Sequence, residues 1–215
     1  MDRPLLLAFD TSAAHCAAAL LSDGQVLAEA HEAMATGQAE RLFPMLEALL
    51  TEGGAGWRDL AGIGVGTGPG NFTGVRLAVA AARGLALGLG IPAVGISAFE
   101  ALAWGRGDVL AVRDARLGAV HLQGFGAGAF GPVTVPLDGP LPPVPPGLAV
   151  VGDLAPEVAA RCGGRAEAPL LPLAVAIGRL ALERLGPDVP RPAPLYLRPA
   201  DAAPAREAPP AILPG

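Results

Sequence analysis

The chain has 215 residues, of which 52% are hydrophobic and 16% are charged, and its formal net charge is −5 at pH 7. This length is enough for one large domain or two small ones with a substantial core. The negative charge argues against broad non-specific binding of nucleic acid by the chain alone. Two cysteines, Cys16 and Cys162, are too few for a disulfide framework. The N-terminus does not have the pattern of a signal peptide, so we expect a cytoplasmic protein.

The first thirty residues predict three strands in an antiparallel meander. An apolar strand over residues 5–9 ends in Asp10, Thr11 and Ser12. A second strand covers residues 13–21, and a hairpin turn leads to a third strand over residues 25–30. Polar residues at the end of a core strand are rigidly placed and are often functional. We therefore treat Asp10, Thr11 and Ser12, together with Asp114 of the second half, as candidates for a degenerate nucleotide or phosphate loop, while a turn-closing role for Asp10 stays open.

A helix is predicted over residues 38–51, because its apolar residues recur at the spacing of one helix face. Pro44 should kink this helix or mark its first turn. The residues on the apolar face are Leu42, Met45, Leu46, Leu49 and Leu50.

A glycine-rich stretch follows, in which a strand around Ile63 runs through a bare turn into a helix over residues 73–89. It is not a Walker A loop, because the chain has no lysine, and no glycine pair has the third glycine of a dinucleotide fingerprint. Asn71 or Thr73 can cap the helix. We interpret the turn as architectural, with direct contact to a ligand as the alternative. The residues of this structural loop are Gly68, Pro69, Gly70, Phe72, Thr73 and Gly74.

The helix over residues 73–89 is apolar on every side, which indicates burial on more than one side. One of these sides is covered either by the chain's own fold or by a partner subunit. Arg76 and Arg83 are seven residues apart and share a face. A strand over residues 91–96 comes next, and Ser97 is positioned to cap a short helix that runs to Trp104.

The second half repeats the order of the first. A strand over residues 109–112 leads to Asp114, two further strands cover residues 119–125 and 130–135, and a later strand ends at Asp153. A helix over residues 172–185 and an extended segment at 194–198 complete the half. This repetition predicts an α/β fold of two related halves. They span residues 1–102 and 103–198, with the helix at 172–185 able to pack back on the first half and a poorly ordered tail at 199–215.

The sequence offers little for a metal site or a catalytic nucleophile. His15, His31 and His121 are isolated, none has a ligand at helical spacing, and no metal site is expected. Asp10 and Asp114 would form a pair able to hold Mg²⁺ or act as a base if the two halves face one another. The alternative is that each carboxylate closes its own turn, with Arg113 or Arg116 beside Asp114.

Three blocks together resemble the TsaB (YeaZ) family of bacterial tRNA threonylcarbamoyladenosine biosynthesis subunits. They are residues 9–12, the block over residues 68–76 that reads Gly-Pro-Gly-Asn-Phe-Thr-Gly-Val-Arg, and residues 114–116. Residues 194–198 agree with this pattern. The resemblance implies the fold of actin, hexokinase and the heat-shock ATPases (the ASKHA fold), which consists of two ribonuclease-H-like subdomains.

The resemblance also implies a function without catalysis by this chain. The family acts as a scaffold or activating subunit of a tRNA-modifying transferase. It pairs with the catalytic subunit TsaD, and together with TsaE the complex moves a threonylcarbamoyl group onto the adenosine beside the tRNA anticodon. TsaD carries a His-x-x-x-His metal motif on its first helix, whereas the corresponding residues 37–41 here contain no histidine. ATP and metal then belong to the partner subunits, tRNA is reached only through the complex, and no membrane is involved.

The family's dimer surface uses the helices of the first half, so a homodimer is expected when the chain is alone. The candidates for the partner interface are Leu42, Met45, Leu46, Leu49, Arg76, Val79, Ala82, Arg83 and Ala86. Two other functions remain as alternatives. An ATP-dependent phosphotransferase of the same fold would use Asp10, Thr11 and Asp114. A glycopeptidase-like metalloprotease finds no nucleophile–base arrangement in the sequence.

Overall fold

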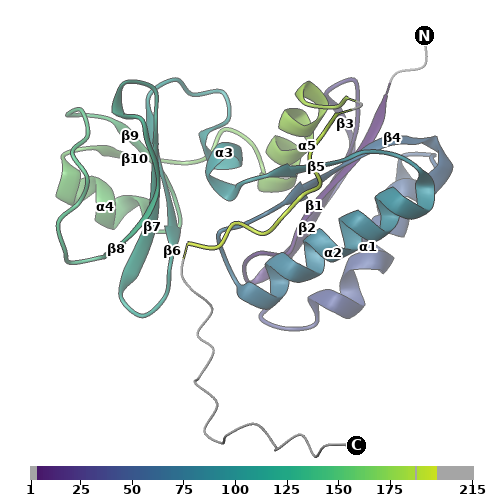
Figure 1. The fold of residues 1–215 in the computed structure, drawn as a ribbon, viewed down its shortest axis with the longest axis horizontal. Helices are drawn as coiled ribbons and strands as arrows, with labels where there is room; N and C mark the ends of the chain where they lie inside the picture. The colour runs from purple at the N-terminus through teal and green to yellow at the C-terminus, as the bar shows by residue number, and fades with distance from the viewer. Residues whose placement is uncertain (1–3, 187, 198–215) are drawn as a thin grey trace, which may run out of the picture.

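Two five-stranded sheets lie side by side in the computed structural model, which describes residues 4–186 and 188–197 (Figure 1). The first sheet consists of β1 (Leu5–Asp10), β2 (His15–Ser22), β3 (Gln25–Ala33), β4 (Leu60–Gly66) and β5 (Ala93–Ile96). The second sheet consists of β6 (Val109–Asp114), β7 (Ala119–Phe125), β8 (Phe130–Pro136), β9 (Ala149–Gly152) and β10 (Arg165–Glu167). The helices are α1 (Gln38–Glu52), α2 (Phe72–Leu89), α3 (Ala98–Ala103), α4 (Ala155–Cys162) and α5 (Leu173–Glu183), with 3₁₀ turns η1 (Trp57–Asp59) and η2 (Gly126–Gly128).

The two sheets have the same topology. The first has the order β3-β2-β1-β4-β5, and the second, taken from its other edge, has the order β8-β7-β6-β9-β10. In each sheet the first three strands form an antiparallel meander, and the fourth and fifth are parallel to the first. Each sheet is thus a ribonuclease-H-like unit, and the pair forms the fold shared by actin, hexokinase and the heat-shock ATPases. The predicted repetition is confirmed.

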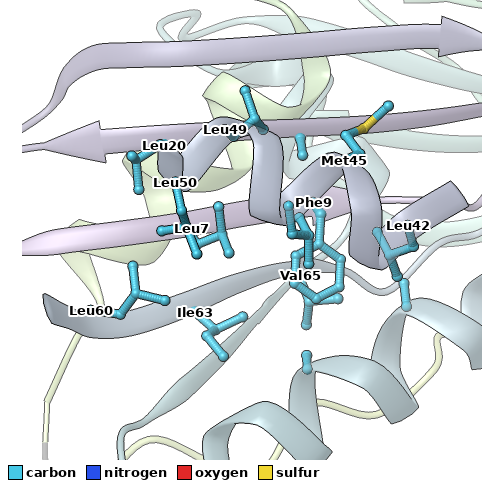
Figure 2. Close-up of a cluster of buried hydrophobic side chains, with 14 of the residues drawn as sticks. Leu7, Phe9, Leu20, Leu42, Met45, Leu49, Leu50, Leu60, Ile63 and Val65 are labelled. Carbon is cyan, nitrogen blue, oxygen red and sulfur yellow. The ribbon is translucent and has the colours of Figure 1, made fainter. Parts of the chain in front are cut away.

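Helices α1 and α2 cover one face of the first sheet. Alternate residues of its strands point toward them, because successive side chains of a strand lie on opposite faces. Leu7, Phe9, Ile63 and Val65 pack there against the leucines of α1, and Figure 2 shows these side chains converging. Helix α5 covers the opposite face through Ile177 and its neighbours.

Strand β4 lets α5 come close because its residues on that face are glycines. A Cβ atom on Gly62 would overlap the side chain of Leu185, and one on Gly64 would lie 2.9 Å from the Cβ of Ala181. Gly178 of α5 meets Leu21 of β2 in the same manner. The glycines that precede the turn in β4 therefore serve helix–sheet packing.

The last helix of each half packs on the sheet of the other half. Helix α3 follows β5 but contacts β6, β7 and β9, and α5 follows β10 but contacts β1, β2 and β4. The remaining face of the second sheet is covered by α4, whose Val158 is buried. This exchange of helices joins the two halves.

The sequence-based expectations need correction in the C-terminal third. Helix α4 and strand β10 were not predicted, because a helix of eight residues leaves little room for a periodic pattern. Pro172 is the N-cap of α5 and not its first helical residue. Residues 194–197 are extended but pair with no sheet among the described residues. Arg198 and the predicted tail at 199–215 lie outside the described residues.

Helix α2 is long and apolar enough to cross a membrane when judged by length and composition alone. Core helices meet the same criterion. In this structure one side of α2 packs on β4 and β5, with Ala78 and Ala82 fully buried.

Candidate functional site

The turn after β1 and the turn after β4 interlock. The Thr11 hydroxyl donates a hydrogen bond to the Gly74 carbonyl oxygen over 2.7 Å, and the Asn71 backbone N–H donates to the Ser12 carbonyl oxygen over 2.6 Å. Thr11 and Ser12 are both buried. Two segments about sixty residues apart in the chain are therefore joined backbone to backbone.

Glycine is required where the two turns touch. A Cβ atom on Gly70 would overlap the Ser12 carbonyl oxygen, and one on Gly74 would overlap the Thr11 carbonyl oxygen. Gly68 has a backbone φ of +84°, a value that residues with a side chain rarely adopt. The Asn71 side chain accepts hydrogen bonds from the N–H groups of Thr73 and Gly74, so Asn71 is the cap of α2. This geometry supports the architectural interpretation of the loop.

The Asp10 carboxylate lies at the centre of this junction and is fully buried. Its Oδ1 accepts hydrogen bonds from the Ser12 N–H and the Ser12 hydroxyl, both over 2.9 Å, and contacts His15 Nε2 at 2.7 Å. Burial raises the pKa of the Asp10 carboxyl. The hydrogen bond and charge of His15, the Ser12 N–H and the charge of Arg113 outweigh that effect, so this pKa lies below its ordinary value of 3.8.

The second carboxylate oxygen of Asp10 has no hydrogen-bond partner among the described residues. It faces Gly66 so closely that a Cβ atom at that position would overlap it. One oxygen is thus saturated by the chain's own donors and the other abuts backbone. A phosphate or a hydrated metal ion would have to displace these contacts to reach Asp10.

Asp114 is held in its own turn. Its Oδ1 accepts a hydrogen bond from the Arg116 N–H over 2.7 Å, and its Oδ2 lies 3.7 Å from Arg116 Nε. Arg113, the residue before it, is buried and lies 3.1 Å from an Asp153 oxygen. Asp10 and Asp114 thus each accept hydrogen bonds within their own turn, as in the alternative considered from the sequence, and a pairing of the two carboxylates around Mg²⁺ stays a prediction.

The histidines are less isolated than the sequence indicated. His15 bonds to Asp10, and its ring centroid lies 5.2 Å from that of His31 on the neighbouring strand. His121 contacts Thr134 across the second sheet. The sequence missed the His15–His31 contact because it depends on the register between β2 and β3. Within the described residues, no group of three or more His, Cys, Asp or Glu side chains could hold a metal ion.

Arg76 and Arg83 do share a face of α2, and both hold the chain's own C-terminal segment, residues 188–197, which we term the strap. Arg83 Nε donates a hydrogen bond to the Pro192 carbonyl oxygen over 2.8 Å, and Arg76 Nε donates to the Tyr196 hydroxyl over 2.7 Å. Nothing in the sequence spacing indicated these partners. A cavity of about 660 Å³ lies between the strap, β5 and the start of α3, and none of the candidate residues of the two turns lines it.

Most of the predicted interface residues point into the core of the chain and not toward solvent. Ala86 is half-buried, and Arg76 and Arg83 are exposed but already hold the strap. The other six pack in the cores of their own chain, where no surface is left for a partner, and the expectation that they contact one directly is wrong. These six are Leu42, Met45, Leu46, Leu49, Val79 and Ala82.

Comparison with known proteins identifies the relatives of this chain. Residues 30–124 match the family model of TsaD, described as tRNA N6-adenosine threonylcarbamoyltransferase. The tRNA threonylcarbamoyladenosine biosynthesis protein TsaB of Escherichia coli is 39% identical over 122 residues, which cover 54% of this chain and 52% of that protein. An uncharacterized protein of Mycobacterium tuberculosis is 36% identical over 206 residues, which cover 93% of this chain and 94% of that protein. A crystal structure from Pseudomonas aeruginosa, of an uncharacterized protein with similarity to peptidase YeaZ, has a TM-score of 0.73 at 28% identity and covers 91% of this chain and 100% of that one.

The chain belongs to the TsaB (YeaZ) family. It spans about half the length of the curated TsaB relatives that it matches first. The match to the TsaD model runs from the end of β3 to β7 and so includes α1 and α2. Of the two interlocked turns, this match contains the one after β4 and not the one after β1.

In this family member several outward residues of α1 and α2 are exposed to solvent. Leu87 has 84% of its surface exposed, and adding a Cβ atom at Gly84 would meet nothing within 4 Å. We name the outward residues of both helices the helix-pair surface. It comprises Phe43, Glu47, Ala80, Gly84 and Leu87.

Proposed function

We propose that the chain is a non-catalytic subunit in tRNA threonylcarbamoyladenosine biosynthesis. In this proposal it pairs with TsaD, while TsaD and TsaE supply the metal and nucleotide chemistry in the cytoplasm. The observation that carries the proposal is that the chain's own groups contact both carboxylate oxygens of Asp10, in a chain of the TsaB family. Ser12, His15 and Gly66 surround the carboxylate at the position where an enzyme of this fold would need an open site.

The closed turns argue against the phosphotransferase alternative. An ATP-dependent enzyme needs carboxylate oxygens available to a metal ion, and Asp10 directs one oxygen at three donors and the other at backbone. Asp114, the second carboxylate of that alternative, is paired with Arg116. The metalloprotease alternative lacks a cluster of possible metal ligands in the described part of the chain.

The proposed contact with TsaD is the helix-pair surface. An exposed large apolar side chain such as Leu87 is a suitable anchor, and the small residues Ala80 and Gly84 allow another helix to approach closely. Because TsaD shares a family model with this very region, the same surface would pair with a second copy of the chain when TsaD is missing.

The proposal is tested by measuring threonylcarbamoyladenosine by mass spectrometry in a reconstituted reaction. The reaction contains TsaD, TsaE, tRNA and threonylcarbamoyl-adenylate, with or without this chain. We expect product over many turnovers only when the chain is present. Equal product without it would overturn the proposal.

The surface is tested separately with a matched pair of substitutions. Leu87→Arg places a charge on α2, and Leu117→Arg places the same charge on the turn after β6, where the leucine is 91% exposed. We expect Leu87→Arg to weaken TsaD binding at least tenfold in calorimetry, while Leu117→Arg leaves it unchanged. The same loss in both variants would argue against the helix-pair surface.

A further inference from the structure

An exposed stack of aromatic and guanidinium groups lies where the strap meets the first turn of α2. The Arg76 guanidinium carbon is 3.6 Å from the centroid of the Phe72 ring and 5.6 Å from that of the Tyr196 ring. The two ring centroids are 5.4 Å apart. Phe72 is 44% exposed and Tyr196 is 46% exposed, so the stack presents much of its surface to solvent.

The stack is held in place by contacts on both sides. The Leu195 N–H, one residue before Tyr196, donates a hydrogen bond to the Thr67 carbonyl oxygen over 2.8 Å. Leu195 and Leu197 pack against the core formed by α3 and the second sheet. Tyr196 is therefore fixed between two anchored neighbours, and a ligand that stacks on it would pay little entropy for ordering the ring.

The charge around the stack differs from that of the whole chain. Helix α2 carries Arg76 and Arg83 and no acidic residue. The strap contributes Arg191 and a single carboxylate, Asp188. Three arginines and one carboxylate thus lie on α2 and the strap, in a chain whose net charge is −5. This region is complementary to a polyanion, unlike the molecule as a whole.

We propose that the Phe72–Arg76–Tyr196 stack binds an unpaired nucleobase of the tRNA substrate. Proteins recognise single-stranded RNA by stacking its bases on aromatic rings and arginine guanidinium planes, with nearby cations facing the phosphates. The stack supplies two rings and a guanidinium plane, and α2 and the strap carry further arginines that can face phosphates. This inference rests on the proposed function, because tRNA reaches the stack within the complex with TsaD.

The test compares two variants of the chain's single tyrosine. Tyr196→Leu keeps an apolar side chain but removes the ring, and Tyr196→Phe keeps the ring but removes the hydrogen bond to Arg76. Fluorescence anisotropy would measure the affinity of each TsaD complex for a labelled anticodon stem–loop RNA. We expect Tyr196→Leu to weaken RNA binding about tenfold and Tyr196→Phe to retain most of it. Thermal unfolding of each variant checks that it is folded.

Ultraviolet cross-linking gives a second readout that does not require the complex. A single-stranded oligonucleotide of the anticodon-loop sequence is irradiated with the chain alone and with the complex, and cross-linked peptides are mapped by mass spectrometry. We expect adducts on Phe72 or Tyr196. Unchanged RNA affinity in Tyr196→Leu, or no adduct at either residue in either sample, would overturn the inference.

Two further outcomes separate this inference from the proposed function. If Tyr196→Leu loses TsaD binding while the RNA affinity of the remaining complex is unchanged, the stack is a protein contact and the inference is wrong. If the wild-type chain forms no complex with TsaD, the proposed function fails, and cross-linking of the chain alone still decides whether the stack binds a base.

Discussion

The two halves share one topology but differ in the layer that covers their outer faces. Between the meander and the fourth strand, the first half has α1 with 15 residues, whereas the second half has the proline-rich loop at 137–148. Between the fourth and fifth strands, the first half has α2 with 18 residues and the second has α4 with eight. Both halves thus share the order of their strands, while only the first half carries two long helices, on which we place the proposed contact with TsaD.

The C-terminal ends of equivalent strands carry the same residue types in the two halves but lie in different surroundings. Asp10 and Asp114 end equivalent strands, but of the two only Asp10 is fully buried, and its Oδ1 contacts the Ser12 N–H, the Ser12 hydroxyl and His15 Nε2. The neighbouring parallel strand ends in glycine in both halves. Gly66 lies against the Asp10 carboxylate, and Gly152 lies against the Val112 carbonyl. In both halves, then, a glycine at the end of the parallel strand allows close packing against the strand beside it, although the group that it packs against differs.

The largest expected effects on stability come from substitutions at glycines that lie against a backbone carbonyl. Gly74→Ala and Gly152→Ala would each drive a Cβ atom into a backbone carbonyl, of Thr11 and Val112 respectively. We expect each to lower the free energy of unfolding by about 3 kcal/mol or more, because backbone cannot move aside cheaply. Urea unfolding measures the change. If one variant lost less than about 1 kcal/mol of its free energy of unfolding and the other lost the expected amount, the two glycines would not be equivalent in the two halves.

The next effect tests which side of the helix layer is core. Leu46→Ala on the inward side of α1 should lower the free energy of unfolding by about 3 kcal/mol, because it leaves a cavity. Leu87→Ala on the outward side of α2 should change it by less than about 0.5 kcal/mol. Thermal and urea unfolding of both variants check this contrast. Similar costs for the two would contradict the assignment of inward and outward sides.

A smaller effect tests the buried carboxylate of the first half. The pKa of Asp10 is lower in the folded chain than its ordinary 3.8. Its ionised form therefore stabilises the fold above that value, and this contribution is lost as the pH falls through the folded pKa. We expect Asp10→Asn to cost about 2 kcal/mol at pH 7. The difference from wild type should narrow in unfolding curves measured toward pH 3, and a constant difference would be inconsistent with the lowered pKa.

The smallest effect distinguishes two glycines of one helix. Gly84 has a helical backbone and open space around its Cα, unlike Gly74. We expect Gly84→Ala to raise the free energy of unfolding by about 0.5–1 kcal/mol, because alanine restricts the unfolded chain and favours helix. Differential scanning calorimetry of the chain would show a higher Tm. A lower Tm would indicate that the outward side of α2 is more crowded than the structure shows.

Much of the fold could be predicted because its signals are local. The apolar run before Asp10, the turn after Ser22 and the alternation at 119–125 predicted strands that the structure contains. Ser97 was expected to cap a helix, and it forms a capping box with Glu100. The short helix α4 carried too few residues to show a period, and strand β10 has only three residues.

The candidate site was less accessible to sequence reasoning. Periodicity marks the apolar side of a helix but does not say whether a sheet or a partner covers it. For that reason Leu42 and Ala82 were placed at an interface although they are buried in their own chain. The partners of Arg76 and Arg83 are more than one hundred residues away, so no local pattern could indicate them.

The sequence by itself determined the repeated order of strands, the glycine-rich turn and the family, because each is written in local residue types and spacings. Only the tertiary structure decided that the turns interlock around the buried Asp10, which side of each long helix is exposed, and that the strap completes an exposed stack with Phe72 and Arg76. These features depend on distances between segments far apart in the chain. Such distances are set when the apolar faces of the helices and sheets pack together.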